Sequence, residues 1–217
     1  VVPIDGKINM DFYVSPEHIG LAKNGQIVKA KIIRYQSPTK NPEVEIVEVL
    51  GDKDDPSIDL PIVIFKHDLP EPGYFPKKVL EEADKLPDKV LPEELKGRKD
   101  FRKERIFTID GDTAKDFDDA VDIKKLKNGN YLLGVHIADV SHYVKEGSEI
   151  EKEAYKRGTS VYLIDTVIPM LPFKLSNEIC SLNEGQDRLT MSLIMEIDPY
   201  GHLVNSRIYN GVIRSVK

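Results

Sequence analysis

The chain has 217 residues, of which 40% are hydrophobic and 31% are charged, and its formal net charge at pH 7 is −6. It has enough apolar residues for a core, but no apolar run approaches the ~20 residues that a membrane-spanning helix requires, so we expect no membrane partner. The net negative charge taken alone argues against a nucleic-acid binder, which usually carries an excess of basic residues, although acidic residues that bind metal would distort this total.

Residues 1–62 show the pattern of short strands separated by turns. Apolar and polar residues alternate over 8–14, and Asn24-Gly25 is a strong turn signal before a strand predicted over 26–35. A further strand is predicted over 43–51. Strands of this length and spacing are typical of a small β-barrel of the OB type, although small sandwiches and SH3-like barrels give the same pattern.

Residues 63–105 are predicted to form a connector with short helices. The segment 52–61, just before it, is polar and rich in Asp and Pro, which predicts a loop. Helices are predicted over 77–86 and 91–97, because apolar residues recur at helical spacing and a proline or glycine ends each run. The charged stretch 98–105 is predicted as a solvated loop, with contact to phosphate groups as the alternative.

From residue 106 to residue 217 the pattern becomes mixed α/β. Short strands are predicted over 106–109, 120–123, 131–137 and 161–164, and a hairpin over 190–197 and 203–213. A helix is predicted from its N-cap Ser148 to Arg157, with Glu151 at the capping-box position and Gly158 as the stop signal. The predicted fold class is α+β, with a small OB-type barrel followed by a mixed α/β domain.

The most distinctive motif is a cluster of aspartates between two of these predicted strands, comprising Asp110, Asp116, Asp118 and Asp119. Carboxylates this close repel one another and raise each other's pKa, so a fold accommodates them best when they are solvated or neutralised by a cation. Oxygen ligands without a nearby His or Cys favour a hard cation, Mg²⁺ or Mn²⁺. Two such ions would clamp the attacking and leaving oxygens of a phosphodiester.

Three other interpretations of the cluster exist. An EF-hand fails, because the loop positions that need an acid or a glycine hold Ala114 and Lys115, or Val121. The spacing Asp-x-Asp occurs twice and also matches the short metal-diphosphate motif of nucleotide-sugar transferases. In the third interpretation the aspartates cap turns and stay solvated, as we expect for Asp112.

The acidic motif and four later segments together resemble one known family. The motif is Thr108-Ile109-Asp110 followed by Asp116-Phe117-Asp118-Asp119-Ala120, and the later segments are Val135-His136-Ile137-Ala138-Asp139-Val140-Ser141, Arg157-Gly158-Thr159-Ser160-Val161-Tyr162, Ile168-Pro169-Met170-Leu171-Pro172 and Leu175-Ser176-Asn177-Glu178-Ile179-Cys180-Ser181-Leu182-Asn183. In this order they resemble the RNB family, the ribonuclease II and ribonuclease R exoribonucleases, with ribonuclease R the more similar. Residues 1 to about 60 resemble the family's second cold-shock (OB) domain, so the resemblance covers essentially the whole chain.

The resemblance implies processive 3′→5′ hydrolysis of single-stranded RNA to nucleoside 5′-monophosphates, with Mg²⁺ as the metal and Mn²⁺ as a substitute. It implies that Asp110, Asp116, Asp118 and Asp119 are catalytic residues and metal ligands, and that cleavage depends most on Asp118. It implies that Tyr162 stacks on the terminal nucleotide. A cytoplasmic, monomeric parent protein without a small-molecule organic cofactor is also expected. The alternative is a catalytically silent RNA-binding relative of the same fold.

Other residues carry structural expectations. His136 is predicted as a core histidine, and Cys180 as a buried small apolar residue; as the single cysteine it excludes an internal disulfide and suits a reducing cytoplasm. Arg188 is predicted to contact a phosphate or to pair with an acid. The chain starts at Val1 without an initiator Met and stops within a predicted strand, so we expect a fragment of a longer protein with little exonuclease activity of its own.

Overall fold

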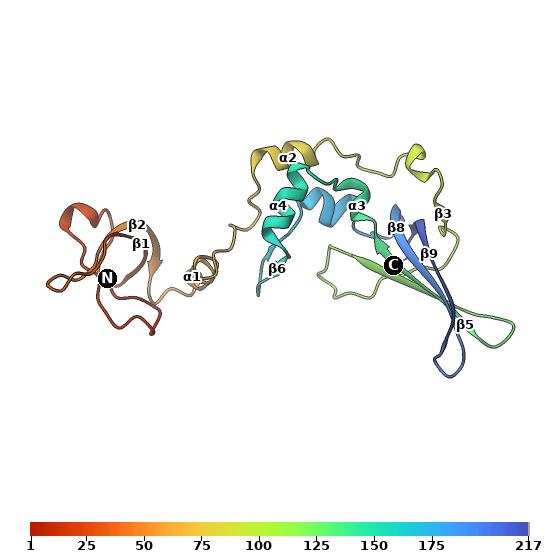
Figure 1. The fold of residues 1–217 in the computed structure, drawn as a ribbon, viewed down its shortest axis with the longest axis horizontal. Coiled ribbons are helices and arrows are strands. Elements are labelled where there is room, and N and C mark those ends of the chain that lie inside the picture. The colour runs from red at the N-terminus through yellow and green to blue at the C-terminus, as the bar shows by residue number, and fades with distance from the viewer. Residues whose placement is uncertain (217) are drawn as a thin grey trace. The chain divides into compact units, whose positions relative to one another are not determined.

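The structure is a computed structural model, and it describes residues 1–216 (Figure 1). The chain divides into two compact units, Val1–Glu71 and a larger one that begins at Pro72. Helices and strands occur in both units, which confirms the predicted α+β class. Within residues 1–216, no helix combines the length and the apolar character needed to cross a membrane.

The first unit is built around one antiparallel pair of strands. They are β1 (Gln26–Arg34) and β2 (Glu43–Asp52), accompanied by the short helices η1 (Pro16–His18), η2 (Pro56–Ile58) and α1 (Asp59–Lys66). Lys29 lies opposite Glu48 in the ladder, and its Nζ is 2.8 Å from Glu48 Oε2. Val44 and Ile58 are buried, so β2 and η2 supply the apolar centre of this unit.

Two local expectations for this unit are wrong. Within the described residues, 8–14 forms no strand: Tyr13 makes an isolated bridge to Glu43, and Ile8 and Met10 of the alternating pattern stay exposed. The predicted loop over 52–61 contains η2 and the start of α1. Asp55 Oδ1 accepts a hydrogen bond from the Ser57 N–H, and this cap starts the helical turn.

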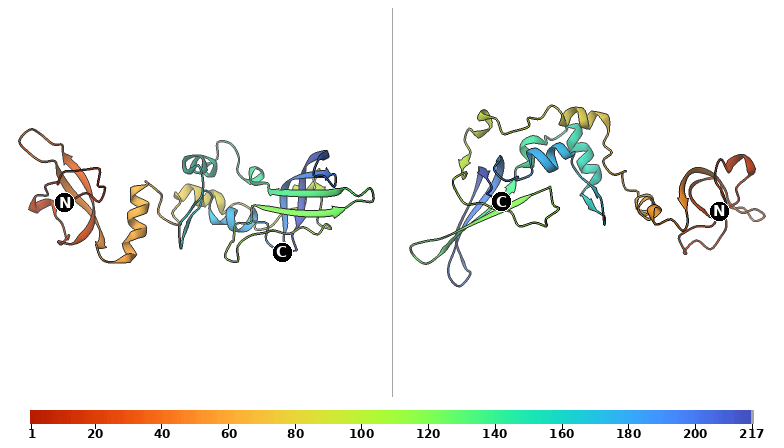
Figure 2. Two further views of the ribbon diagram at one scale, coloured as in Figure 1. Left: turned by 90° about the horizontal axis from the view of Figure 1, so that it is seen from below. Right: turned by 180° about the vertical axis from the view of Figure 1, so that it is seen from behind.

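The second unit centres on a five-stranded sheet with the strand order β3-β9-β8-β5-β4 (Figure 1). Its strands are β3 (Lys99–Asp100), β4 (Asp119–Lys125), β5 (Tyr131–Ala138), β8 (Asp187–Ile197) and β9 (Leu203–Arg214). The short β3 runs parallel to β9, and the other neighbours are antiparallel. Figure 2 shows the long β4–β5 and β8–β9 hairpins from two further sides.

The helical elements of this unit lie before the sheet and between β5 and β8 in the chain. They are α2 (Lys77–Ala83), η3 (Pro92–Leu95), α3 (Val140–Tyr143), α4 (Glu149–Arg157) and the π-helix η4 (Lys174–Ile179), together with the strand pair β6 (Val161–Tyr162) and β7 (Val167–Ile168). Their apolar side chains form the core with residues of the sheet, among them Leu175, Ile179, Leu182 and Ile213. Ile106 and Ala120 of the same core are fully buried, so the core fixes the chain on both sides of the acidic motif.

The strongest sequence signals in this unit are confirmed. Strands β5, β8 and β9 lie within three residues of the predicted ranges. Ser148 Oγ accepts a hydrogen bond from the Glu151 N–H at 3.1 Å, and Gly158 ends α4 with φ of 74°. The Glu151 carboxylate accepts from the Gly147 N–H rather than from the cap residue itself.

Weaker predictions need correction. The strand predicted over 106–109 is reduced to an isolated bridge from Phe107 to Val121. The helix predicted over 77–86 ends at Ala83, and the one predicted over 91–97 is a 3-10 turn, η3. Pro76 and Pro87 flank the first helix, and the second begins at Pro92 and is followed by Gly97, so neither extends further.

Candidate active site

The four predicted aspartates lie on a segment that leaves the edge of the sheet and returns to it. Phe107 exchanges two backbone hydrogen bonds with Val121, of 3.0 and 2.9 Å, and the chain turns where the Ala114 N–H bonds to the Gly111 carbonyl. It re-enters the sheet at Asp119, the first residue of β4. The Asp118 carbonyl accepts from the Ala138 N–H at 2.9 Å, which places the carboxylates beside the end of β5.

Asp118 is the electrostatic centre of this group. Partial burial, followed by the charges of Asp116, Asp119 and Asp110, raises the pKa of its carboxyl group above the ordinary value. Since these three charges act on Asp118, the structure places their carboxylates near that of Asp118, as the sequence predicts. Asp112 takes no part in this effect on Asp118 and is exposed, which agrees with its expected role in a turn.

The donor chemistry of this neighbourhood fits a hard divalent cation. All four side chains offer carboxylate oxygens, and a cation would offset both the burial and the neighbouring charges that raise the pKa of Asp118. The positions of the side chains fit less closely, since no group of three or more His, Cys, Asp or Glu side chains within residues 1–216 is arranged to hold a metal ion.

Tyr162 reaches the acidic segment from a different part of the chain. It lies on β6, its ring is 62% exposed, and its hydroxyl donates a hydrogen bond to Asp116 Oδ2. This hydrogen bond is the main cause that raises the pKa of Tyr162 to about 12. The phenol therefore stays protonated at neutral pH and remains a donor to the carboxylate.

A cavity of about 300 Å³ lies between these residues. Asp116, Asp118 and Tyr162 form its polar edge, and Val140, Met170 and Leu171 belong to its apolar wall. An apolar wall beside an exposed phenol ring suits a flat ring such as a nucleobase, and the adjacent carboxylates suit a cation bound to a phosphate. The cavity thus brings together the acidic motif and Tyr162, which lie in separate segments of the sequence.

A buried ion pair supports the chain where it leaves β5 for α3. Arg98 Nη2 donates to Asp139 Oδ2 at 2.7 Å, and both side chains are less than 10% exposed. Burial alone would raise the pKa of Asp139, but the hydrogen bonds from Arg98 and Ser141 hold it below its usual value. His142 Nε2 lies 2.7 Å from Glu94 Oε1, so η3 is tied to α3 by the same group of residues.

Several individual predictions can be compared with this geometry. Cys180 is buried, and its burial raises the pKa of its thiol to about 12, so it acts as an apolar residue as predicted. Arg188 is also buried, and within the described residues it donates to the carbonyls of Ser181 and Asp187 and pairs with no acidic side chain. The charged stretch 98–105 is not simply solvated, because Arg98 and Phe101 are buried within it.

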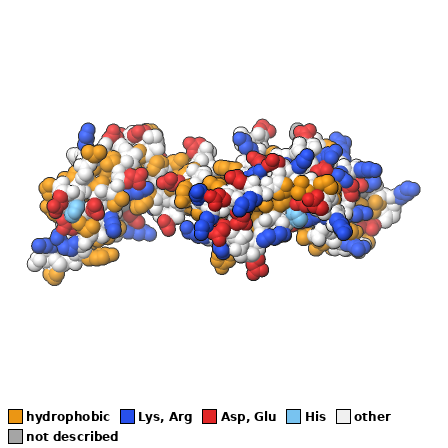
Figure 3. All heavy atoms as spheres, turned by 90° about the horizontal axis from the view of Figure 1, so that it is seen from above, with side chains coloured by type: hydrophobic (Ala, Val, Ile, Leu, Met, Phe, Trp, Pro, Cys, Tyr) orange, Lys and Arg blue, Asp and Glu red, His pale blue; other side chains and the backbone are white. Residues whose placement is uncertain are grey.

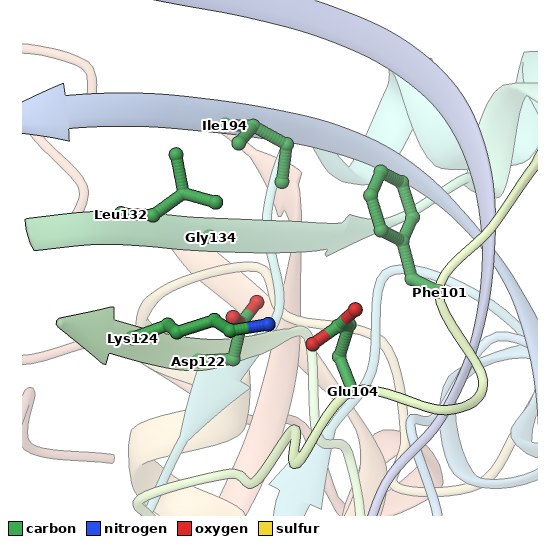
Figure 4. A pocket seen from close by; sticks show the side chains of 7 residues that line it. All are labelled: Phe101, Glu104, Asp122, Lys124, Leu132, Gly134 and Ile194. Carbon is green, nitrogen blue, oxygen red and sulfur yellow. The ribbon is translucent and has the colours of Figure 1, made fainter. Parts of the chain in front are cut away.

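His136 is a core histidine, as predicted, and it belongs to a buried polar group inside the sheet. Its Nε2 lies 2.8 Å from Asp122 Oδ2, and its Nδ1 lies 2.8 Å from Ser192 Oγ. A small cavity of about 70 Å³ opens beside Asp122 (Figure 4). In Figure 4 the Asp122 carboxylate lies between β4 and β5, next to Gly134, whose missing side chain leaves the space for it.

Charged side chains cover much of the surface. Figure 3 shows Lys and Arg side chains interspersed with Asp and Glu side chains on the face that is drawn. The net charge of −6 is therefore not gathered into one large area of that face.

Comparison with family models places known domains on both units. A model described as RNB domain matches residues 98–217, and one described as Cold shock domain matches residues 1–72. Among curated proteins, ribonuclease R of Thermotoga maritima is 66% identical over all 217 residues. The match covers 31% of that protein, so the chain spans about a third of the relative's length.

Solved structures show the same similarity. Two RNA complexes of Mycoplasma genitalium RNase R, one with double-stranded RNA and one with ribose-methylated single-stranded RNA, have TM-scores of 0.85 and 31% identity. They cover 95% of this chain, and the chain covers 36% and 32% of theirs. Yeast Ssd1, described as a pseudonuclease, has a TM-score of 0.70 over 89% of this chain and 24% of its own, and at 22% identity it shows a shared fold alone.

Proposed function

The chain belongs to the RNB family, and from this membership we propose that the full-length protein containing it is a cytoplasmic, Mg²⁺-dependent 3′→5′ exoribonuclease. It degrades single-stranded RNA processively to nucleoside 5′-monophosphates without an organic cofactor. The observation that carries the proposal is the cavity in which Asp116 and Asp118 face an exposed Tyr162. Its lining supports a site for a terminal nucleotide, with an aromatic ring for the base and carboxylates for a cation bound to the phosphate.

In this proposal Tyr162 binds the terminal base, and the carboxylates bind the cation. Tyr162 holds the terminal base by stacking, which is worth ~1–3 kcal/mol per base. Its hydroxyl fixes the orientation of Asp116, so ring and carboxylate are placed together. The four carboxylates, Asp110, Asp116, Asp118 and Asp119, would hold Mg²⁺, with Mn²⁺ as a substitute. When bound, the metal lowers the pKa of a water molecule and offsets the negative charge that develops on the phosphate.

Asp118 suits this role because it is partly buried beside three other acidic side chains. Asp118 carries a raised pKa, so its ionised form gains more from a nearby cation than an isolated aspartate would. The apolar wall formed by Val140, Met170 and Leu171 excludes water from one side of the bound nucleotide. Hydrolysis then depends on water that reaches the phosphate from the acidic side.

The test uses the full-length protein with 5′-labelled single-stranded RNA and Mg²⁺. The wild type is expected to give a ladder that shortens to a small limit product, and Asp118→Asn or EDTA is expected to abolish it. Asp112→Asn is the matched control, because Asp112 is an exposed aspartate of the same segment. It is expected to keep activity within about twofold, since it changes the same charge without removing a proposed ligand.

The second candidate is a catalytically silent RNA-binding protein, which the positions of the carboxylates favour, since no group of three or more such side chains within residues 1–216 is arranged to hold a metal ion. It predicts that RNA is bound and stays intact with and without Mg²⁺. That result in the wild type would contradict the exonuclease proposal. Cleavage that Asp118→Asn leaves unchanged would place the chemistry elsewhere in the protein.

A further inference from the structure

A single buried hydroxyl group holds the centre of the acidic segment. Ser181 Oγ accepts a hydrogen bond from the Phe117 N–H at 3.1 Å and donates one to the Lys115 carbonyl at 2.8 Å. A hydroxyl offers one donor and two acceptor sites, so it makes both bonds at once. The Ser181 side chain is fully buried, and its two partners are the residues next to Asp116 on either side.

The residue that follows adds a third bond to the same place. The Leu182 N–H donates to the Phe117 carbonyl at 2.9 Å, so both backbone polar groups of Phe117 are bonded to residues 181 and 182. Lys115 and Phe117 lie outside any helix or strand. These bonds therefore fix the backbone between Asp116 and Asp118, in the absence of the regular hydrogen bonds of a helix or strand.

Ser181 is itself fixed from the sheet. Arg188 on β8 donates from Nε to the Ser181 carbonyl at 2.7 Å, and Ser215 Oγ donates to the Leu182 carbonyl at 2.9 Å. Arg188 and Ser215 are both buried. Burial of a guanidinium group is costly unless its N–H groups are bonded, and here its Nε is committed to the Ser181 carbonyl.

We propose that Ser181 is a positioning residue that sets the places of the Asp116 and Asp118 carboxylates, an inference that rests on the proposed function. The link runs through the backbone of Lys115 and Phe117, so loss of the hydroxyl leaves the aspartates in the chain but releases the segment that carries them. The Phe117 N–H and the Lys115 carbonyl then lose this partner and must hydrogen-bond to water. A displacement of ~1 Å in a catalytic group can cost about 100-fold in rate.

The experiment compares three variants in the full-length protein. Ser181→Ala removes the hydroxyl, and Ser181→Cys keeps a similar size with a weaker donor and acceptor. Ser192→Ala is the matched control, because Ser192 is also fully buried and lies within hydrogen-bond distance of two side chains, those of His136 and Thr190, away from the acidic segment. The measurements are kcat and KM on labelled single-stranded RNA, and the rise in Tm on adding Mg²⁺.

Ser181→Ala is expected to lower kcat at least about tenfold, to leave KM within about twofold, and to reduce the Mg²⁺-induced rise in Tm. Ser181→Cys is expected to have a kcat and a Mg²⁺-induced rise in Tm between those of Ser181→Ala and the wild type. If the alanine variant does not fold, the cysteine variant provides the test. Ser192→Ala is expected to lower Tm while keeping kcat and the Mg²⁺ response.

The inference is wrong if the Ser181 variants keep the wild-type kcat and Mg²⁺ response. It is equally wrong if Ser192→Ala reproduces their losses, because the effect would then be one of general stability. A wild type that binds RNA without degrading it would overturn the proposed function and this inference with it. A wild type that is active beside unaffected Ser181 variants would overturn the positioning role alone.

Discussion

At the scale of single residues, Tyr162 joins two parts of the candidate site. Its ring is exposed enough to stack on a base, while its hydroxyl is committed to Asp116. Substitutions can separate these contributions, because phenylalanine keeps the ring and removes only the hydrogen bond. Comparing RNA binding in the alanine and phenylalanine variants would show how much of it depends on the ring and how much on the hydrogen bond to the carboxylate.

Tyr162→Ala is expected to raise the KM for single-stranded RNA about 5- to 150-fold, the equivalent of ~1–3 kcal/mol of stacking. Tyr162→Phe is expected to keep KM within about fivefold, since the lost hydrogen bond is exposed and worth about 1 kcal/mol or less. Steady-state kinetics on labelled RNA measures both. Tyr155→Ala, at an 85% exposed tyrosine of α4, is the control. Equal increases in KM in the two Tyr162 variants would contradict stacking.

Asp139 carries a pH dependence whose sign follows from its environment. Its pKa in the folded chain lies below the ordinary 3.8, because the bonds from Arg98 and Ser141 outweigh burial. The ion pair therefore contributes its full stability above the unfolded pKa, and this contribution is lost as pH falls through the folded pKa. Asp139→Asn leaves Arg98 buried without its partner, which costs about 3 kcal/mol or more.

Urea denaturation measures this difference. Asp139→Asn is expected to be clearly less stable than the wild type at about pH 7. The difference in unfolding free energy is expected to be smaller at about pH 3, which lies below the ordinary pKa of an aspartate, because the stability contributed by the ion pair starts to be lost there. Asp112→Asn serves as the exposed control and is expected to show little difference at either pH. A gap that stays constant between the two pH values would contradict the role of the Arg98–Asp139 pair.

At the scale of elements, the sheet of the second unit is organised around polar residues as well as apolar ones. His136, Asp122 and Ser192 face each other from β5, β4 and β8. Gly134 makes this possible, since a Cβ added there would lie 2.0 Å from Asp122 Oδ2 and 2.8 Å from His136 Nε2. The sheet thus requires glycine at this position for space rather than for an unusual backbone angle.

Gly134→Ala is expected to destabilise the protein by about 1–3 kcal/mol, the usual cost of forcing extra volume into a packed interior. Urea denaturation would show a lower midpoint with a similar slope. Gly111→Ala is the matched control, because a Cβ there meets nothing within 4 Å and the backbone φ is not positive. If both variants unfold alike, the close packing around Asp122 is not what constrains position 134.

The sequence predicted the elements whose signals are local and missed those that depend on distant partners. The β8–β9 hairpin and the α4 cap follow from alternation and capping residues within a few positions. The π-helix η4 gives no periodic signal, and the alternating run 8–14 has no ladder within the described residues. In the site, the aspartates and Tyr162 were predicted from their motif and the family resemblance. The role of Ser181 could not be predicted, because only the folded structure brings its hydroxyl to the backbone of Phe117 and Lys115.

At the scale of the whole molecule, the two units have different internal organisation. The first has one strand pair and few buried apolar residues, among them Val44 and Ile58, while the second has an extended core under a five-stranded sheet. A small core contributes little stability by itself. The matches to cold-shock and RNB models fall on these two units, so the difference in core size follows the boundary between two known domain types.

The hydrogen bonds around Phe117 also bear on how such a protein can change over evolutionary time. They involve the backbone of residues 115 and 117, so they do not require any of the four carboxylates. A lineage that replaced Asp116 or Asp118 would lose an acidic group and keep the geometry of the surrounding chain. The proposed chemistry is thus separable from the fold, because the carboxylates that it needs are not the groups that hold the backbone of this segment.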